Sequence, residues 1–142
     1  MSLPRRYRLS GKAAFSEVFE QSVVSADASF KVFGRATNEP ECRLGLAVSR
    51  QVDKRAVARN RLKRIIRESF RSHVEANARQ RPDADAEAGH QTVDVVVCPR
   101  RHAVSLENSQ LFEQLSRHWR RIEGRVRQAN AGPAHDRHLT SR

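Results

Sequence analysis

Basic side chains recur at three- and four-residue steps between residues 50 and 71, a spacing suited to binding a row of phosphate groups. This segment contains nine Lys and Arg residues and only two acidic residues, Asp53 and Glu68, so its net charge is +7. On a helix, positions 59, 63, 67 and 71 would lie on one face and repel one another. Phosphates would relieve that repulsion, and the arginine guanidinium matches their geometry. The pattern therefore predicts a phosphate-binding helix face.

The charge of the whole chain supports the same interpretation. Its 142 residues include 27 Lys and Arg against 16 Asp and Glu, giving a net charge of +11 and a pI near 11.2. Residues 5–12 add +4 and residues 117–142 add +5, so the remaining chain is mildly acidic. A clustered excess indicates a surface that binds a polyanion. If about six side chains each neutralise one phosphate, log affinity should fall against log salt with a slope of about −4 to −5.

No set of side chains suited to catalysis or metal binding emerges from the sequence. The six His residues, at positions 73, 90, 102, 118, 135 and 138, share no metal-ligand spacing and accompany no nucleophile motif. Cys42 and Cys98 are too few for a disulfide framework and lack the CxxC spacing, which favours reduced thiols in the cytoplasm. A glycine-rich phosphate loop is missing as well. We therefore expect no catalytic residue, no metal site and no small-molecule substrate in this chain.

Four phenylalanines form a second candidate site. Phe15 and Phe19 are one helical turn apart, and Phe30 and Phe33 lie on an expected strand. Their rings could stack on unpaired bases, or they could simply fill the core. Spacing alone leaves both interpretations open.

The hydrophobic pattern places these residues on one α+β domain. It predicts helices at 11–20, 54–78 and 106–122, and strands at 29–37, 43–49 and 92–98. The turn at 38–40 favours a hairpin between the first two strands, and the order strand, long helix, strand favours a parallel βαβ unit. Gly45 marks a bulge or the close approach of another backbone.

The remaining segments bound this domain. Residues 80–91 are expected to form an acidic loop, and residues 124–142 a basic disordered tail, which leaves a single nucleic-acid-binding domain at residues 1–123. No apolar run approaches the roughly 20 residues that span a bilayer. The basic N-terminus is not followed by the apolar stretch of a secretory signal. Neither a membrane partner nor export is expected.

Three segments resemble the bacterial ribonuclease P protein component. Residues 56–68, AVARNRLKRIIRE, are similar to that family's arginine-rich RNR signature. Residues 43–50, RLGLAVSR, resemble its R-x-G-x-x-V-S-K/R strand, and Arg8-Leu9 through Phe15, Val18 and Phe19 resemble its amino-terminal pattern. The resemblance covers about residues 5–122.

This resemblance implies a particular α+β fold. The family is a two-layer sandwich with the element order αβββαβα, in which a mixed four-stranded sheet contains a left-handed βαβ crossover that carries the arginine-rich helix. General rules of chain topology would instead predict a right-handed crossover. We follow the resemblance on this point.

The resemblance also implies a function and a set of site residues. The family's enzyme is a ribonucleoprotein endoribonuclease that removes the 5′ leader of precursor tRNA, and its RNA subunit, with bound Mg²⁺, performs the hydrolysis. The protein is an accessory subunit. Residues expected to bind the RNA subunit are Arg55, Arg59, Asn60, Arg61, Lys63, Arg64, Arg67 and Arg71. Residues expected to bind the single-stranded leader are Phe15, Phe19, Phe33 and Arg50.

Two other classes of protein are compatible with a basic α+β domain. A ribosomal-type protein could clamp RNA through an arginine helix without serving catalysis. A DNA-binding regulator could place the same helix in a major groove. The sequence shows neither a helix-turn-helix partner for this helix nor a sign of dimer half-sites, so this alternative is not favoured. Stimulation of precursor-tRNA cleavage would distinguish the ribonuclease P subunit from both alternatives.

Overall fold

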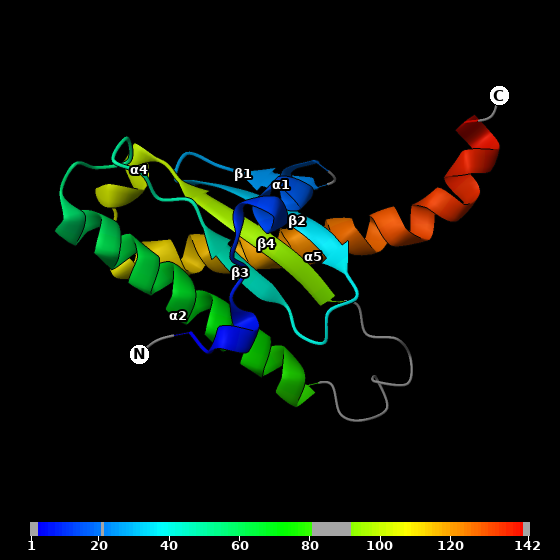
Figure 1. Ribbon diagram of the computed structural model, residues 1–142, viewed down its shortest axis with the longest axis horizontal. Coiled ribbons are helices and arrows are strands. Elements are labelled where there is room, and N and C mark those ends of the chain that lie inside the picture. Colours follow the sequence, from blue (N-terminus) through cyan, green and yellow to red (C-terminus); the bar gives the residue numbers. More distant parts are fainter. Residues whose placement is uncertain (1–2, 21, 81–91, 141–142) are drawn as a thin grey trace.

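The computed structural model describes residues 3–20, 22–80 and 92–140, which form a four-stranded sheet with helices on both faces (Figure 1). The element order confirms the expected α+β fold with a mixed sheet, with two short helices added. The elements are η1 (Arg5–Tyr7), α1 (Lys12–Glu20), β1 (Val23–Ala26), β2 (Phe30–Thr37), β3 (Arg43–Leu46), α2 (Ala56–Gln80), β4 (Thr92–Pro99), α4 (Arg101–Val104) and α5 (Asn108–Thr140).

The strands lie in the order β1-β2-β4-β3. Strand β4 pairs parallel with β3 and antiparallel with β2, so the predicted parallel βαβ unit around α2 is confirmed. The predicted hairpin between 29–37 and 43–49 is wrong, because β2 forms its hairpin with β1. The valine-rich β4 is buried along nearly its whole length, and such a strand takes the central position between two neighbours. The left-handed crossover stays a prediction.

The main core lies between the sheet and the helices α2 and α5. Alternate strand residues such as Val32, Val95 and Val97 point into it and meet Leu62 and Ile66 of α2. Helix α5 contributes to this core an apolar stripe at helical spacing, which consists of Leu111, Leu115, Trp119, Ile122 and Val126. This layer of helices on a sheet is the expected two-layer sandwich.

A smaller cluster covers the opposite face of the sheet. There α1 places Val18 against Val96 of β4, with Phe15 and Phe33 partly buried beside them. Residues that alternate with the main core along β2 and β4 therefore face α1. Helix α1 thus lies outside the two main layers and covers the other face of the sheet.

The C-terminal part of the chain corrects one prediction. Residues 124–142 were expected to form a disordered tail, but α5 continues to Thr140 and passes behind the sheet in Figure 1. Val126, with only 3% of its surface exposed, extends the apolar stripe by one turn beyond Ile122. The polar composition after Gly124 concealed the burial of Val126. The acidic loop predicted at 80–91 lies, from residue 81 onward, outside the described residues.

No helix in the described part of the chain is long and apolar enough to cross a bilayer.

Candidate nucleic-acid interface

Helix α2 carries one buried face and one basic face, as its periodicity predicted. Leu62, Ile65, Ile66 and Phe70 are buried by the sheet and α5. Asp53, just before the helix, accepts a 2.7 Å hydrogen bond from the backbone N–H of Arg55. Hydrogen bonds from Arg55 also hold the pKa of the Asp53 carboxyl at about 2, so it stays ionised. All eight residues predicted to bind the RNA subunit lie on α2 or immediately before it.

Several basic side chains of this face already have partners within the protein. Arg64 lies 3.5 Å from Glu68 and Arg71 lies 3.8 Å from Glu75, each one helical turn further on. Arg59 donates from Nη1 to the backbone carbonyls of Asp53 and Lys54, at 3.0 and 2.8 Å. By contrast, Lys63, Arg67 and Asn60 make no side-chain hydrogen bond or ion pair with the described residues.

Arg61 lies on α2 but turns toward the protein. Its guanidinium donates to the backbone carbonyls of Val104 and Leu106 and to the Oδ1 atom of Asn108, the last at 3.0 Å. These acceptors belong to the connection between α4 and α5. The prediction that Arg61 binds RNA is therefore untested, whereas its contacts assign it a role in joining α2 to the start of α5. Sequence spacing could not reveal this, because the acceptors are more than 40 positions away.

Helix α1 and the sheet face that it covers bring together the three predicted leader-binding phenylalanines, and we call the partly exposed apolar surface around them the cleft. The helix crosses the strands, with Phe15 over β3 and Phe19 against β2. Phe19 meets Phe33 edge to face with ring centroids 4.8 Å apart, and Phe19 is 43% exposed. The Nζ atom of Lys31 lies 5.2 Å from the centre of the Phe33 ring. The structure thus brings Phe15 and Phe19 of α1 together with Phe33 of β2.

Gly45 explains how Phe15 fits under α1. A side chain at position 45 would begin 2.6 Å from the Cζ atom of the Phe15 ring, which is closer than carbon atoms approach. Glycine therefore leaves the space that the ring occupies. The sequence predicted a close approach at this position, but the approaching group is an aromatic side chain rather than another backbone.

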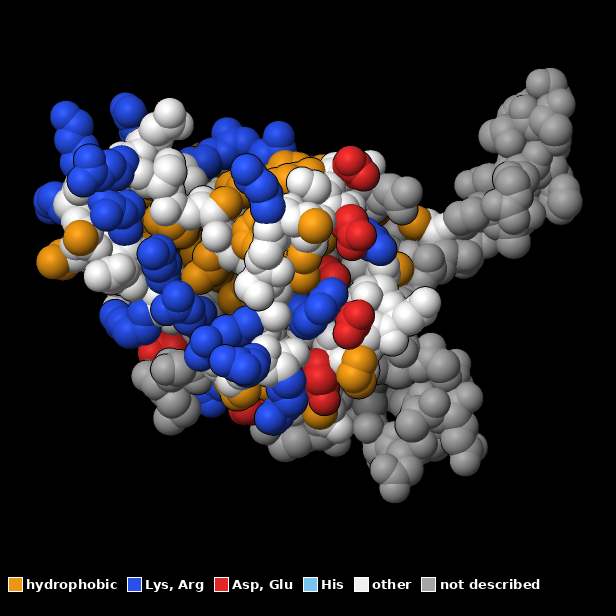
Figure 2. All heavy atoms as spheres, in the orientation of Figure 1, with side chains coloured by type: hydrophobic (Ala, Val, Ile, Leu, Met, Phe, Trp, Pro, Cys, Tyr) orange, Lys and Arg blue, Asp and Glu red, His pale blue; other side chains and the backbone are white. Residues whose placement is uncertain are grey.

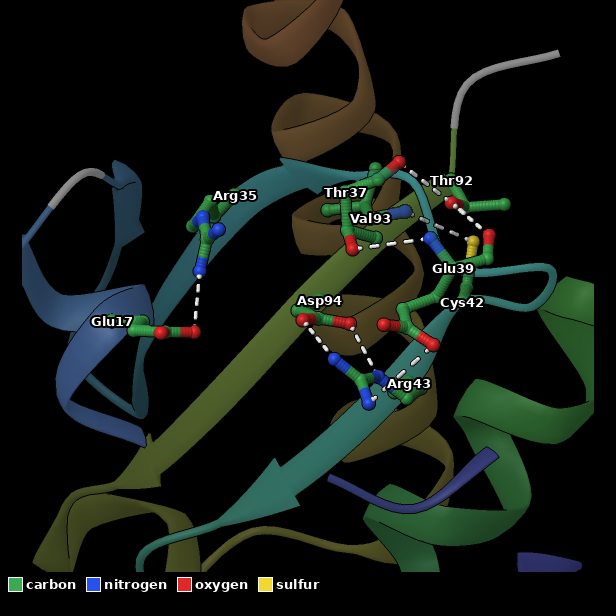
Figure 3. A network of polar contacts seen from close by, with 9 residues as sticks. All are labelled: Glu17, Arg35, Thr37, Glu39, Cys42, Arg43, Thr92, Val93 and Asp94. Carbon is green, nitrogen blue, oxygen red and sulfur yellow. Dashed lines mark hydrogen bonds and ion pairs between the residues drawn. The ribbon is translucent and has the colours of Figure 1, made fainter. Parts of the chain in front are cut away.

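A row of charged residues borders the cleft on one side (Figure 3). Asp94 of β4, almost fully buried, accepts two hydrogen bonds from the guanidinium of Arg43, at 2.9 and 2.7 Å. The hydrogen bonds to Asp94 raise the pKa of the Arg43 guanidinium above its ordinary value. Arg35 of β2 donates to Glu17 of α1 at 3.2 Å, which ties the helix to the sheet. The strand register places Arg35, Asp94 and Arg43 side by side, and only that register could have identified the group.

Arg50, the remaining residue predicted to bind the leader, lies in the exposed turn after β3. This turn is fixed by Arg101 of α4, whose Nε donates to the carbonyl oxygen of Gln51 at 2.8 Å. Arg100 precedes α4, and its backbone N–H donates to Ser29 at 2.7 Å. The structure therefore places Arg50 near the basic residues that follow β4.

A buried polar cluster links α5 to the β1–β2 hairpin. His118 Nδ1 lies 2.7 Å from Ser25 Oγ, and His118 Nε2 lies 2.9 Å from Asp27 Oδ2. Burial lowers the pKa of His118 despite the carboxylate beside it. We assign the neutral tautomer, in which Nε2–H donates to Asp27 and Nδ1 accepts from the Ser25 hydroxyl.

The connectivity of this cluster is that of a serine hydrolase triad, which the sequence did not indicate. Ser25 is nevertheless fully buried, and its Oγ also accepts a 3.0 Å hydrogen bond from Arg121. A substrate has no access to that oxygen, so the cluster serves packing. The described residues bring together no group of three His, Cys, Asp or Glu side chains that could hold a metal ion.

Basic side chains gather on one part of the α1 side of the molecule. Figure 2 shows Lys and Arg over the left and lower left, where Figure 1 places α2 and α4, and acidic side chains toward the right. Apolar side chains are visible between these regions. An apolar cleft that adjoins a basic surface is an arrangement suited to single-stranded nucleic acid.

Comparisons of the sequence with known proteins agree with this geometry. The family model of ribonuclease P matches residues 3–123. The ribonuclease P protein component of Methylococcus capsulatus is 40% identical over 116 residues, which cover 82% of this chain and 80% of the relative. That of Vibrio cholerae is 36% identical over 118 residues, which cover 83% of this chain and 89% of the relative.

Solved structures show the same fold. An RNase P protein from Staphylococcus aureus superposes with a TM-score of 0.67 at 26% identity, covering 82% of this chain and 88% of that one. The RNase P protein from Thermotoga maritima gives a TM-score of 0.62 at 26% identity, covering 81% and 96%. The chain therefore belongs to the bacterial ribonuclease P protein component family, which implies an RNA partner and a part in the 5′ maturation of tRNA.

Proposed function

We propose that this protein is the accessory subunit of a cytoplasmic ribonuclease P and that it binds two RNAs on two surfaces. Its α2 face binds the catalytic RNA, and the cleft under α1 binds the single-stranded 5′ leader of precursor tRNA. Hydrolysis of the phosphodiester bond belongs to the catalytic RNA with its Mg²⁺. The observation that carries this proposal is the Phe19–Phe33 pair, in which Phe19 is 43% exposed, in the cleft beside a basic helix.

Support for the leader contact comes from the aromatic side chains of the cleft. An aromatic ring that is 43% exposed and adjoins a second ring offers a face on which a base can stack. Stacking of this kind contributes about 1–3 kcal/mol for each base and tolerates any base sequence. A subunit that holds the leaders of many different tRNAs needs such tolerance.

Support for the contact with the catalytic RNA comes from the charges of α2. Lys63 and Arg67 have no acidic partner among the described residues, and both lie on the side of α2 that faces away from the core. Phosphates of a folded RNA would supply the missing negative charge. Screening of those phosphates would also favour Mg²⁺ binding by the RNA.

The test is cleavage of precursor tRNA by a bacterial ribonuclease P RNA at low Mg²⁺ and moderate salt, with and without this protein. We expect the wild type to stimulate cleavage at the mature 5′ end. Arg67→Glu should weaken binding of the protein to the catalytic RNA and leave the leader cleft intact. Phe19→Ala should weaken binding of precursor tRNA to the assembled enzyme about 10-fold and leave assembly unchanged.

The two variants control for each other, because each should affect one assay only. Equal losses in both assays would refute the division between the two surfaces. Salt-sensitive RNA binding without any stimulation, tested with a matched RNA subunit, would instead favour the ribosomal-type alternative.

A further inference from the structure

Helix α5 has a basic surface of its own, separate from that of α2. Between residues 117 and 127 it carries five exposed arginines and one acidic residue, Glu123. At about 100° per residue, Arg117, Arg121 and Arg125 follow one another along a single flank of the helix. We call these three residues the α5 arginine stripe. Arg120 and Arg127 lie on the adjoining outer side of the helix.

The α5 arginine stripe lacks a negative partner in the part of the chain that the structure describes. Glu123 points the other way, toward α2, where it accepts hydrogen bonds from His73 at 2.9 Å and Asn77 at 3.2 Å. Arg117 and Arg125 make no ion pair with any described residue. Arg121 makes one hydrogen bond, to the hydroxyl of Ser25. Exposed like charges one turn apart repel one another, so an anion that binds along the stripe would be stabilised.

The hydrogen bond from Arg121 to Ser25 locates the stripe. Ser25 belongs to β1, the strand at one edge of the sheet, whereas α2 packs beside β3 near the opposite edge. The stripe therefore lies along the β1 edge, on the sheet face opposite α1. It occupies the flank of α5 that faces β1, whereas Glu123 on the other flank faces α2.

The leader cleft runs toward this same edge. Its aromatic floor begins at Gly45 of β3, where Phe15 sits, and reaches Phe33 of β2, where Phe19 sits. The next residue in that row is Val24 of β1, which pairs with Phe33. An RNA chain that follows α1 from the α2 side passes Phe33 and then needs to cross only one more β-strand, a spacing of about 4.8 Å, to reach the edge of the sheet. Arg121 lies beside that edge on the other face of the sheet, hydrogen-bonded to Ser25 of β1.

We propose that the α5 arginine stripe binds the phosphates of leader nucleotides that lie beyond those in the cleft. The leader would enter beside α2, follow α1 past the exposed part of Phe19 and pass around the β1 edge to the stripe. This inference rests on the proposed function, since it extends the path of the same single-stranded RNA. It predicts that the protein distinguishes long leaders from short ones.

The test compares Arg117→Gln/Arg125→Gln with the wild type in a reconstituted holoenzyme, using precursor tRNAs whose leaders lengthen one nucleotide at a time. Arg121 is left in place because it also holds Ser25. The matched control is Arg120→Gln/Arg127→Gln, which removes the same charge from the other side of the same helix. Binding affinity and its salt dependence are measured for each leader length.

We expect the wild-type affinity to rise with leader length and then level off, and the stripe variant to level off at a shorter leader. For long leaders the variant should bind roughly 3- to 10-fold more weakly, with a salt slope shallower by about 1.4, since each phosphate contact of a single strand contributes about 0.7. Short leaders and the control variant should show neither change.

Four results would overturn the inference. An equal loss for short and long leaders, or an equal loss in the control variant, would show that the stripe acts only through overall charge. Weaker binding of the catalytic RNA in the absence of substrate would assign the stripe to that RNA. No change at any leader length would leave the stripe without a role in leader binding. Failure of the wild type to stimulate cleavage would count against the proposed function instead.

Discussion

The two basic helices, α2 and α5, have similar arginine spacing but differ in whether their arginines form ion pairs with glutamates on the same helix. On α2, Arg64 and Arg71 each pair with a glutamate one turn further on. On α5, the one acidic residue among the arginines between 117 and 127 is directed toward α2. The number of arginines on a helix therefore does not measure the charge available to a partner. What counts is which guanidinium groups the protein has already paired.

The largest expected effect is that of removing Arg61. This residue lies on the basic helix α2, but its guanidinium is hydrogen-bonded within the protein instead of being available to RNA. Arg61→Gln loses hydrogen bonds to two carbonyls and to Asn108, which should destabilise the fold by about 2 kcal/mol. Chemical denaturation measures this loss. Arg67→Gln, which removes the same charge from an exposed site, serves as the control and should leave stability unchanged. If the two variants were equally stable, Arg61 would be free to bind RNA.

Neutralising the two unpaired residues of α2 should have the next largest effect. Lys63→Gln/Arg67→Gln is expected to weaken binding to the catalytic RNA about 10-fold and to make the salt slope shallower by about 1.8, since each phosphate contact contributes about 0.9. Arg64→Gln/Arg71→Gln removes equal charge from side chains already paired with glutamates, so its effect should be smaller. Salt titrations of RNA binding measure both. Identical losses would show that the internal ion pairs do not reduce the availability of arginine.

The smallest expected effect is a dependence of stability on pH through His118 of α5. Burial lowers the pKa of His118 in the folded state, so the unfolded chain binds a proton more readily. Stability should therefore fall as the pH decreases below about 6.5, the ordinary pKa of histidine. We expect a lower Tm at pH 5.5 than at pH 7.5, by less than the loss in Arg61→Gln.

His118→Gln isolates this contribution from those of Asp27 and the nearby Arg117 and Arg121, which remain in place. The variant should be less stable at neutral pH and show a weaker pH dependence over this range. An unchanged pH dependence would mean that other groups cause it.

Local sequence patterns predicted most of the helices and strands but not how the strands pair. The alternation of apolar residues located β2, β3 and β4, and the 3.6-residue period located α2 and the N-terminal part of α5. β1 was not identified from its own four residues, and the hairpin was assigned to the wrong partner. Strand pairing depends on which strand is buried on both sides, and that property of β4 arises only when the helices are packed on the sheet.

The amino-acid sequence by itself determined the family, the position of the basic helix and the phenylalanines that α1 and β2 contribute to the cleft. These follow from motifs and from local periodicity. Only the tertiary structure decided which arginines are available, because Arg61, Arg43 and Arg121 meet partners that are distant in sequence. The same holds for Val126, whose burial requires the sheet beneath it. A side chain's charge is set by its type, but its availability to RNA is set by the contacts that folding provides.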